Sequence, residues 1–426
     1  MCLMIDLEAE GSRPIRALLV GRTEDKALSD HDALRELSSL VKTAGLTVAG
    51  TIVLRRNEPS AKFGIGSGKA EEISLQAQEL DADEIVFDFE ISPTQQRNWD
   101  SLTGKTCLDR QEVIIRIFAA RAITREAVLQ VELARMEYSL PRLTHAHEYL
   151  SRQRGGAFGN KGSGETQLEL DRRGVMNRIA LVKKELKAVR KDRATMRKRR
   201  ERVPVPSCAI VGYTNAGKSS LLNALTDAGV LSEDKLFATL DPTTKRYSLP
   251  NGRTILLTDT VGFIRNLPHT LVDAFHATLE EAAFADAVLI VLDASDPDIA
   301  VHEKTTKEVL SEVGAADRPV LTVLNKIDRL DGVSRQTLCA LYPDAVSISA
   351  KTREGFQSLI SRIDSLLGGD EGVYLLPHAR QDLVAFAHRE GSVSSIEYGD
   401  EFIRMHARSS GRLSAALAPF AEKGHV

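Results

Sequence analysis

The chain has 426 residues, of which 42% are hydrophobic and 27% charged, with four cysteines and a formal net charge of −3. This composition is that of a globular protein of two to four domains, which excludes wholesale disorder. No apolar run reaches the roughly 20 residues that span a bilayer, and the first residues lack a secretory signal pattern. The cysteines are far apart in sequence, which argues against a zinc ribbon or a disulfide framework. We therefore expect a cytoplasmic, monomeric protein without membrane insertion.

Residues 1–123 predict an N-terminal α/β domain. Apolar runs typical of strands alternate with stretches typical of helices, the strands at 17–20, 48–54 and 84–87 and the helices near 31–44, 69–80 and 93–102. Such alternation forms βαβ units on a parallel sheet. The string Gly64-Ile65-Gly66-Ser67-Gly68-Lys69 looks like a nucleotide loop, but Phe63 and Ala70 occupy the positions of the flanking Gly and Ser/Thr. We favour a turn before a helix, or an RNA contact, over a second nucleotide site.

Residues 124–203 predict an antiparallel helical hairpin, which we call the arm. Its first helix carries apolar residues that step by four, three and four, namely Leu129, Leu133, Met136 and Leu140. Its second helix has an apolar residue at every seventh position, namely Leu168, Val175, Val182, Val189 and Met196. Two further apolar residues, Ile179 and Leu186, lie between these positions. Both patterns are typical of heptad seams, and a polar, Gly-rich tip at 152–165 separates them.

The arm concentrates positive charge. Between Arg172 and Arg202 there are 14 Lys and Arg against three acids, a local net charge of +11. A run of this kind usually meets a polyanion, although a solvated helix face is the alternative. The glycines of the tip allow close approach to a surface, and its cations and aromatic ring suit phosphates and unpaired bases. The candidate RNA-binding residues are Arg152, Arg154, Phe158, Lys161, Arg197, Lys198, Arg199 and Arg200; a linker is the alternative for the tip.

Residues 204–368 predict a second α/β domain, and 369–426 a small α+β unit. The prolines at 204 and 206 end the arm, because proline cannot continue a helix. Near-continuous Val, Ile and Leu runs suit strands buried on both faces, at 208–211, 254–258, 287–292 and 320–324. In the C-terminal unit, an alternating stretch from Ser394 to Ile403 contains the hairpin signal Gly399-Asp400.

A phosphate-binding loop follows the first strand of this second domain. The sequence fits G-x-x-x-x-G-K-[ST] between a strand and a helix, with Gly212, Tyr213, Thr214, Asn215, Ala216, Gly217, Lys218 and Ser219. Its backbone N–H groups would face the phosphates, Lys218 would reach the β- and γ-phosphates, and Ser219 would bind Mg²⁺. A Gly-rich turn without function is the much weaker alternative.

Downstream motifs select GTP over ATP. An N-K-x-D string ends a buried strand, with Asn325, Lys326, Ile327 and Asp328. Asp328 can accept from two guanine N–H groups that adenine does not present together. A second string follows the next strand and would offer backbone N–H groups to guanine O6, with Ser349, Ala350 and Lys351. The D-x-x-G element would hold the Mg²⁺ water shell through Asp259 and sense the γ-phosphate through Gly262, with Thr260 and Val261 between.

A switch segment lies between these motifs and contains Phe237, Ala238, Thr239, Leu240 and Asp241. GTPases keep here a threonine that completes the Mg²⁺ shell when γ-phosphate is present. Thr239, Thr243 and Thr244 all fit the spacing; the F-x-T-L pattern of Obg-like GTPases favours Thr239. We expect Lys218, Thr239 and Gly262 to act in hydrolysis.

The residue after Gly262 is Phe263, where Ras-type switches place a glutamine that orients the attacking water. A phenyl ring cannot do this, so we expect a low intrinsic rate and help from a partner or a cation. Asn215 suggests K⁺ as that cation, because several GTPases without the switch glutamine hold K⁺ through an asparagine here.

From about residue 15 to 420, the chain resembles the HflX family of ribosome-associated GTPases. The resemblance rests on the Gly64–Lys69 string, Ser92-Pro93-Thr94-Gln95-Gln96-Arg97-Asn98, Thr124-Arg125-Glu126-Ala127, the tip and the switch motifs, in that order. It implies a GTPase that binds the large ribosomal subunit and its rRNA and separates stalled or idle ribosomes into subunits. A tRNA-modification GTPase would share the phosphate loop, but that resemblance implies a C-terminal catalytic Cys, and the last cysteine here is Cys339. A signalling G protein would leave the arm unexplained.

Overall fold

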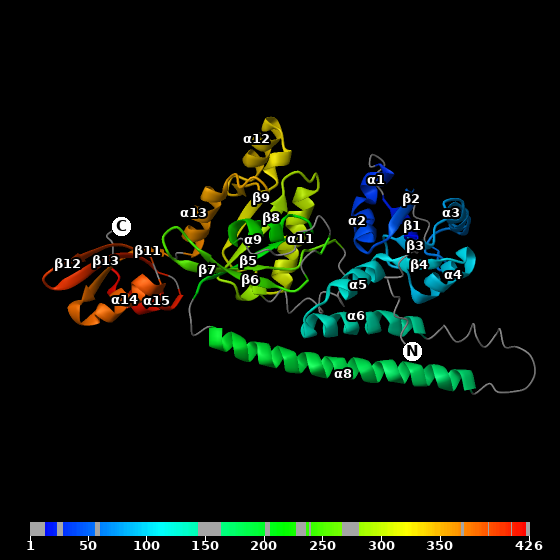
Figure 1. The fold of residues 1–426 in the computed structure, drawn as a ribbon, viewed down its shortest axis with the longest axis horizontal. Helices are drawn as coiled ribbons and strands as arrows, with labels where there is room; N and C mark the ends of the chain where they lie inside the picture. The colour runs from blue at the N-terminus through cyan, green and yellow to red at the C-terminus, as the bar shows by residue number, and fades with distance from the viewer. Residues whose placement is uncertain are drawn as a thin grey trace, which may run out of the picture. The chain divides into compact units, whose positions relative to one another are not determined.

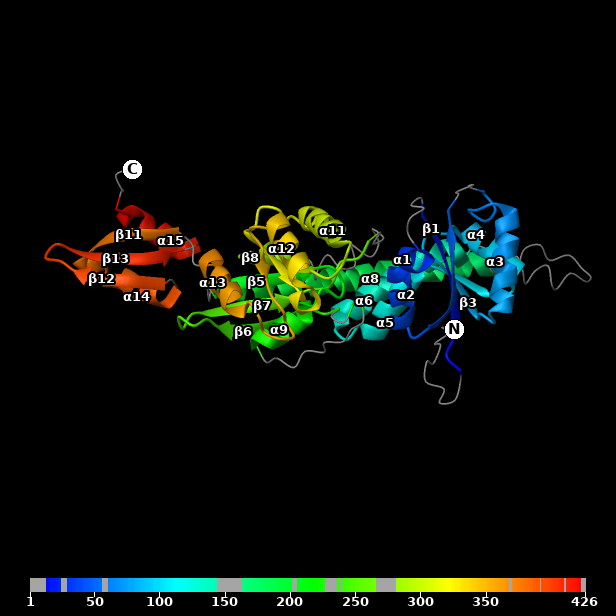
Figure 2. The same ribbon diagram turned by 90° about the horizontal axis from the view of Figure 1, so that it is seen from above.

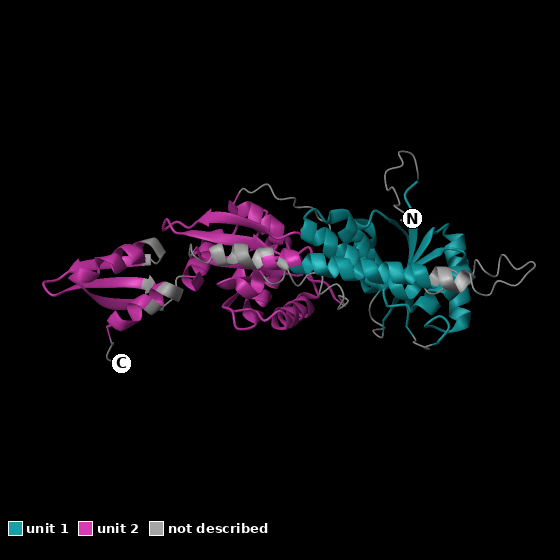
Figure 3. Ribbon diagram, turned by 90° about the horizontal axis from the view of Figure 1, so that it is seen from below, with its two compact units in different colours: residues 1–187, 268–274 teal, residues 188–267, 275–426 magenta. Residues whose placement is uncertain are grey.

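The structure is a computed structural model that describes residues 13–23, 29–55, 60–143, 163–200, 205–226, 236–237, 240–265, 281–367, 370–390, 392–409 and 411–422. The chain divides into two compact units, one with the described residues up to Lys187 and one with those from Ala188 on (Figure 3). Among the described residues, no helix combines the length and the apolarity needed to cross a membrane. The finer division into four domains stays a prediction.

The first unit contains a parallel four-stranded sheet (Figure 1), as the sequence predicts. Its order is β2-β1-β3-β4, with β1 at Arg16–Arg22, β2 at Thr47–Leu54, β3 at Glu84–Phe87 and β4 at Thr106–Asp109. The three expected strands are confirmed. The fourth, β4, has only four residues and no long apolar run, and the sequence pattern did not single it out.

Helices cover both faces of this sheet (Figure 2). They are α1 at Asp30–Ala33, α2 at Arg35–Thr43, α3 at Ser67–Glu79, α4 at Pro93–Thr103 and α5 at Arg110–Arg121. On the α3 and α4 side, Leu18, Val20 and Phe87 pack with Trp99 in one buried cluster. The Gly64–Lys69 string is the turn into α3, with Gly66 as the N-cap. Phe63 anchors this turn, because its carbonyl accepts from Trp99 Nε1 at 3.0 Å.

The arm consists of α6 at Arg125–Leu143 and α8 at Ser163–Arg200. Arg125 pairs with Glu185 and Glu132 with Arg178, so the two helices run antiparallel, as predicted. The predicted seam of α8 is confirmed where its side chains are described, because Val182 and Leu186 are buried whereas the neighbouring Leu181 is 46% exposed. The side chains of Leu168 and Met196 lie outside the described residues.

The other face of α6 packs on the N-terminal domain. Tyr138 donates to Asp109 Oδ1 at 3.0 Å, and Arg142 donates to Asp109 Oδ2 at 3.2 Å and to the Ile91 carbonyl at 3.1 Å. Arg142 also donates to Gln96 Oε1 at 2.8 Å. Asp109 is fully buried, and desolvation by burial raises its pKa against the opposing effect of Arg142. We call Asp109, Tyr138 and Arg142 the α6 clamp.

The second unit contains a six-stranded sheet in the order β10-β9-β8-β5-β7-β6. Its strands are β5 at Ser207–Gly212, β6 at Thr243–Ser248, β7 at Thr254–Asp259, β8 at Ala287–Asp293, β9 at Val320–Asn325 and β10 at Val346–Ser347. All pairs are parallel except β6 with β7, so the sheet is mixed. Helix α9 at Lys218–Thr226 and helix α13 at Phe356–Leu367 share one buried core with the strands. Two further helices are α11 at Ile299–Glu312 and α12 at Gly332–Leu341.

The C-terminal residues form a small α+β unit, as predicted. Its antiparallel sheet has the order β11-β13-β12, with β11 at Asp370–Pro377, β12 at Ser392–Tyr398 and β13 at Phe402–Ser409. Helix α14 at Gln381–Glu390 and helix α15 at Gly411–Leu417 supply the rest of its core. The predicted hairpin closes where the Gly399 N–H donates to the Phe402 carbonyl.

Candidate functional site

The phosphate loop connects β5 to α9, and two of its glycines are required by sterics. A Cβ at Gly212, where φ is +147°, would lie 2.2 Å from the Val291 carbonyl oxygen. A Cβ at Gly217, where φ is +93°, would lie 2.3 Å from Nδ2 of Asn325. Backbone atoms and a buried amide cannot move aside, so both positions exclude other residues. Helix α9 begins at Lys218, and its N-terminus favours the negative charge of a phosphate group.

Lys218 is held inside this loop. Its Nζ donates to the carbonyl oxygens of Gly212 at 3.1 Å and Tyr213 at 2.8 Å, and the side chain is buried. Desolvation lowers the pKa of Lys218 to about 8, with nearby Asp259 opposing the shift. Burial disfavours the charged ammonium group of Lys218, so a phosphate placed beside it would form a strong charge-assisted hydrogen bond and favour the protonated form.

Ser219 and Asp259 bring two oxygen groups together at the end of β7. The Ser219 hydroxyl donates to Asp259 Oδ2 at 2.6 Å, and Asp259 is fully buried. Mg²⁺ takes oxygen ligands, commonly a hydroxyl or carboxylate together with water and phosphate oxygens. These residues therefore fit the predicted magnesium site. The Thr214 hydroxyl nearby is buried and, among the described residues, has no hydrogen-bond partner, which suits a polar ligand.

Asn325 joins the phosphate loop to the predicted base-reading loop. Its Nδ2 donates to the Ala216 carbonyl at 2.9 Å, and its Oδ1 accepts from the Ala350 N–H at 3.0 Å. The side chain is 1% exposed. One buried amide therefore fixes the spacing between the two loops that the sequence assigns to phosphate and guanine.

Lys326 and Asp328 lie on either side of the start of a short 3₁₀-helix, η1 at Ile327–Arg329. Lys326 Nζ donates to the Asn215 carbonyl at 2.6 Å and pairs with Asp293 at 2.7 Å. Asp328 accepts from the Ser349 hydroxyl at 2.6 Å, and this hydrogen bond lowers the pKa of Asp328. The carboxylate is therefore kept in its ionised form, in which both oxygens can only accept hydrogen bonds. Sequence reasoning missed Asp293, whose one signal is that it ends the apolar β8.

The switch segment is described only in part. Phe237 and Leu240 are buried, whereas Ala238 and Thr239 lie outside the described residues. Of the two competing threonines, Thr244 lies on β6 and shares a hydrogen bond with Thr258 at 2.9 Å. After Gly262, Phe263 is 3% exposed.

The predicted RNA-binding residues also fall outside the described side chains. The tip residues Arg152, Arg154, Phe158 and Lys161 are outside the described residues, and the side chains of Arg197, Lys198, Arg199 and Arg200 are as well. The positions 197–200 belong to α8.

The fold and the site together define a P-loop GTPase, because a phosphate loop, a D-x-x-G element and a guanine-type N-K-x-D loop converge at one edge of one sheet. GTPase HflX of Akkermansia muciniphila is 46% identical over 414 residues, which cover 93% of this chain and 95% of the relative. The chain belongs to the HflX family of GTPases.

Other comparisons agree over most of the length. GTPase HflX of Lacrimispora saccharolytica is 44% identical and covers 96% of each chain, and GTPase HflX of Escherichia coli is 41% identical and covers 83% of each. Residues 31–119 match the family described as GTP-binding GTPase N-terminal, and residues 121–200 match the GTP-binding GTPase middle region. Residues 207–326 match the family described as 50S ribosome-binding GTPase.

Proposed function

We propose that this GTPase binds the large ribosomal subunit and separates stalled or idle ribosomes into subunits. The observation that carries the proposal is the α6 clamp, which ties the end of the arm helix that precedes the predicted tip in sequence to the N-terminal domain. Arg142, the penultimate residue of α6, makes contacts with Asp109, Ile91 and Gln96. The match of residues 207–326 to a 50S ribosome-binding GTPase family supports the choice of the large subunit.

The clamp matters because splitting requires force on an RNA surface. The clamp holds the end of α6 on the N-terminal domain, so a tip that extends from this helix would start from a fixed support. We assign rRNA contact to the tip at 152–165, where cations suit phosphates and Phe158 suits a base, and to the cations at 197–200. The affinity that these cations give for rRNA should fall as the salt concentration rises, since binding releases counterions.

At the nucleotide site, Mg²⁺ would be held by Ser219, by Thr239 and, through water, by Asp259. We keep Thr239, which the F-x-T-L pattern favours; Thr243 and Thr244 both lie on β6, where Thr244 is engaged with Thr258. Lys218 and the Gly262 N–H would contact the γ-phosphate. Because Phe263 cannot orient water, we infer a low intrinsic rate that ribosomes raise, with K⁺ bound through Asn215 as a second cofactor.

The test of the proposal removes the tip and leaves the nucleotide residues in place. Light scattering of intact ribosomes and phosphate release are measured for the parent and for a variant shortened from Gly155 to Gly164. The variant should keep the parent's GDP affinity without ribosomes, yet neither split ribosomes nor show full ribosome-stimulated hydrolysis. Unimpaired splitting by this variant would return the tip to the linker interpretation.

A charge reversal separates attachment from splitting. Reversal of Arg197, Lys198, Arg199 and Arg200 should weaken sedimentation with the large subunit and flatten its dependence on salt. Reversal of Lys304 and Lys307, exposed cations on α11, is a control with half that change in charge and should change neither. Parent protein that fails to sediment with ribosomal subunits in GTP analogue or GDP would favour a signalling or tRNA-modification GTPase instead.

A further inference from the structure

The chain after the D-x-x-G element follows the phosphate loop beyond the ends of the strands. The Phe263 N–H donates to the Gly212 carbonyl at 3.0 Å, and the Thr214 N–H donates to the Phe263 carbonyl at 2.8 Å. These bonds extend the β5–β7 pairing into the loop and press Gly262 against it. A Cβ at Gly262 would lie 2.8 Å from Thr214 Cα and 2.9 Å from Lys218 Nζ.

Tyr213, the second residue of the phosphate loop, holds the next part of this segment. Its hydroxyl accepts from the Arg265 N–H at 2.8 Å. Its ring stacks on His302 of α11, with centroids 3.7 Å apart and planes at 12°. Both rings are buried, at 5% and 7% exposure. Tyr213 therefore connects three parts of the site: the phosphate loop, the segment after Gly262 and α11.

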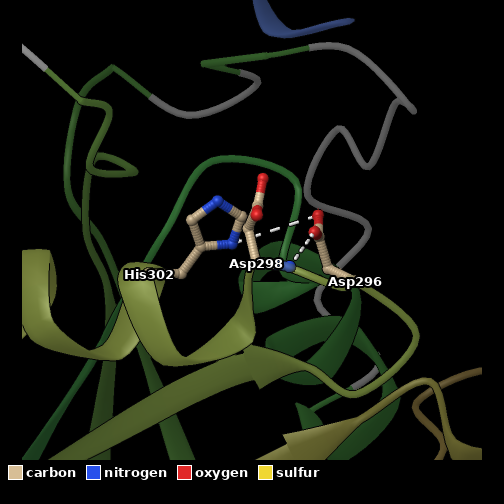
Figure 4. A group of neighbouring side chains, drawn as sticks. All are labelled: Asp296, Asp298 and His302. Carbon is tan, nitrogen blue, oxygen red and sulfur yellow. Dashed lines mark hydrogen bonds and ion pairs between the residues drawn. The ribbon is translucent and has the colours of Figure 1, made fainter. Parts of the chain in front are cut away.

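Two acidic residues just before α11 lie beside the His302 ring (Figure 4). Its Nδ1 lies 4.0 Å from Asp296 Oδ2, and Asp296 Oδ1 accepts from the Asp298 N–H at 3.0 Å. Asp298 in turn pairs with Arg265 at 3.7 Å. The three side chains are of types that bind metals, and their ligand atoms lie within 4.8 Å of one another. The contacts described above, however, already give them a structural role, because they join the start of α11 to Arg265 and to the His302 ring.

We propose that Tyr213 is a positioning residue for GTP hydrolysis, which holds Gly262 beside Lys218 through the Arg265 N–H and the stack on His302. The proposal rests on the contact of Gly262 with the γ-phosphate given under the proposed function. GDP has no γ-phosphate and does not meet Gly262. Loss of the Tyr213 contacts should therefore affect GTP binding and turnover and spare GDP binding.

Four variants test this in steady-state kinetics without ribosomes, with GDP and GTP-analogue affinities measured alongside. Tyr213→Phe keeps the ring and removes the hydroxyl, and His302→Ala removes the stacked ring. Each should lower kcat roughly three- to tenfold, the value of one hydrogen bond or ring contact, and lower the preference for GTP analogue over GDP. His302→Phe restores a ring against Tyr213 and should recover most of the lost kcat. Lys304→Ala, an exposed change on the same helix, is the matched control.

The outcomes divide clearly. Parent-like kcat and nucleotide preference in Tyr213→Phe would overturn the proposal. An equal loss of GDP and GTP-analogue affinity would also overturn it, because it would mean that Tyr213 only supports the fold of the phosphate loop. A parent that does not hydrolyse GTP would instead contradict the function proposed for the site, and this result is read from the parent alone.

Discussion

Substitution of Asn325 by Ala should weaken nucleotide binding through two loops at once. The Asn325 side chain gives one hydrogen bond to the Ala216 carbonyl and takes one from the Ala350 N–H, and it is 1% exposed. Alanine leaves the buried Ala216 carbonyl and the half-buried Ala350 N–H without this partner. It also removes the contact that sets the spacing of the phosphate loop from the base-reading loop.

The expected magnitude follows from these two bonds. Each hydrogen bond is worth about 1 to 1.5 kcal/mol, so the substitution should destabilise the nucleotide-free protein by about 2 to 3 kcal/mol. The Kd for GDP should weaken by up to the corresponding roughly 30- to 150-fold, because nucleotide binding must then restore the spacing of the two loops. The Kd is measured by titration with a fluorescent GDP analogue, and the melting temperature is measured with and without GDP. Asn251→Ala is the matched control, since this exposed amide contacts Asp364 far from the loops in sequence. A Kd for Asn325→Ala within twofold of the parent would refute the reasoning.

Four other results are expected. Lys218→Ala should reduce GTP hydrolysis to background in a phosphate-release assay, because the phosphates lose their fixed cation; substantial turnover would contradict its role. The lowered pKa of Lys218, about 8 against 10.5, means that the unfolded chain keeps this proton after the folded chain has lost it. Nucleotide-free protein should thus gain stability between pH 8 and 10.5 relative to Lys218→Met, and a constant difference would argue against the shift. Asp328→Asn should lower the preference for guanine nucleotides in competition binding, because an amide offers one acceptor where guanine needs two; unchanged selectivity would be evidence against the base-reading assignment. Hydrolysis should be faster in K⁺ than in Na⁺ if Asn215 binds the ion, and equal rates would remove K⁺ from the mechanism.

The sequence predicted the parts of the site that local sterics and motif order determine. Gly212 and Gly217 are required by close contacts with β8 and with Asn325, and such positions keep a fixed spacing along the chain. The buried strands were also predictable, because each is an apolar run. The strands β4 and β6 were not singled out, since neither is an apolar run.

Partners that meet only after folding could not be predicted. The hydroxyl of Tyr213 meets Arg265, 52 residues further on, and its ring meets His302 on another helix. No spacing in the sequence relates these residues. Asp293 likewise belongs to the site only through Lys326, which pairs with Asp293 and donates to the Asn215 carbonyl of the phosphate loop. Polar residues that end buried strands are therefore candidates for such roles, but their partners come from the tertiary structure.

The two arm helices differ in how much sequence change they can accept. Helix α6 buries Ala127, Val131 and Ala134 and carries the clamp residues Tyr138 and Arg142. A substitution at any of these positions would disturb a packed neighbour. The described part of α8 is exposed apart from its seam. Selection can thus retune the charge of α8 residue by residue, toward a different polyanion or ionic environment, without a compensating change in any core. Divergence within the arm should accumulate on the exposed positions of α8 between 169 and 189 and be rare on α6.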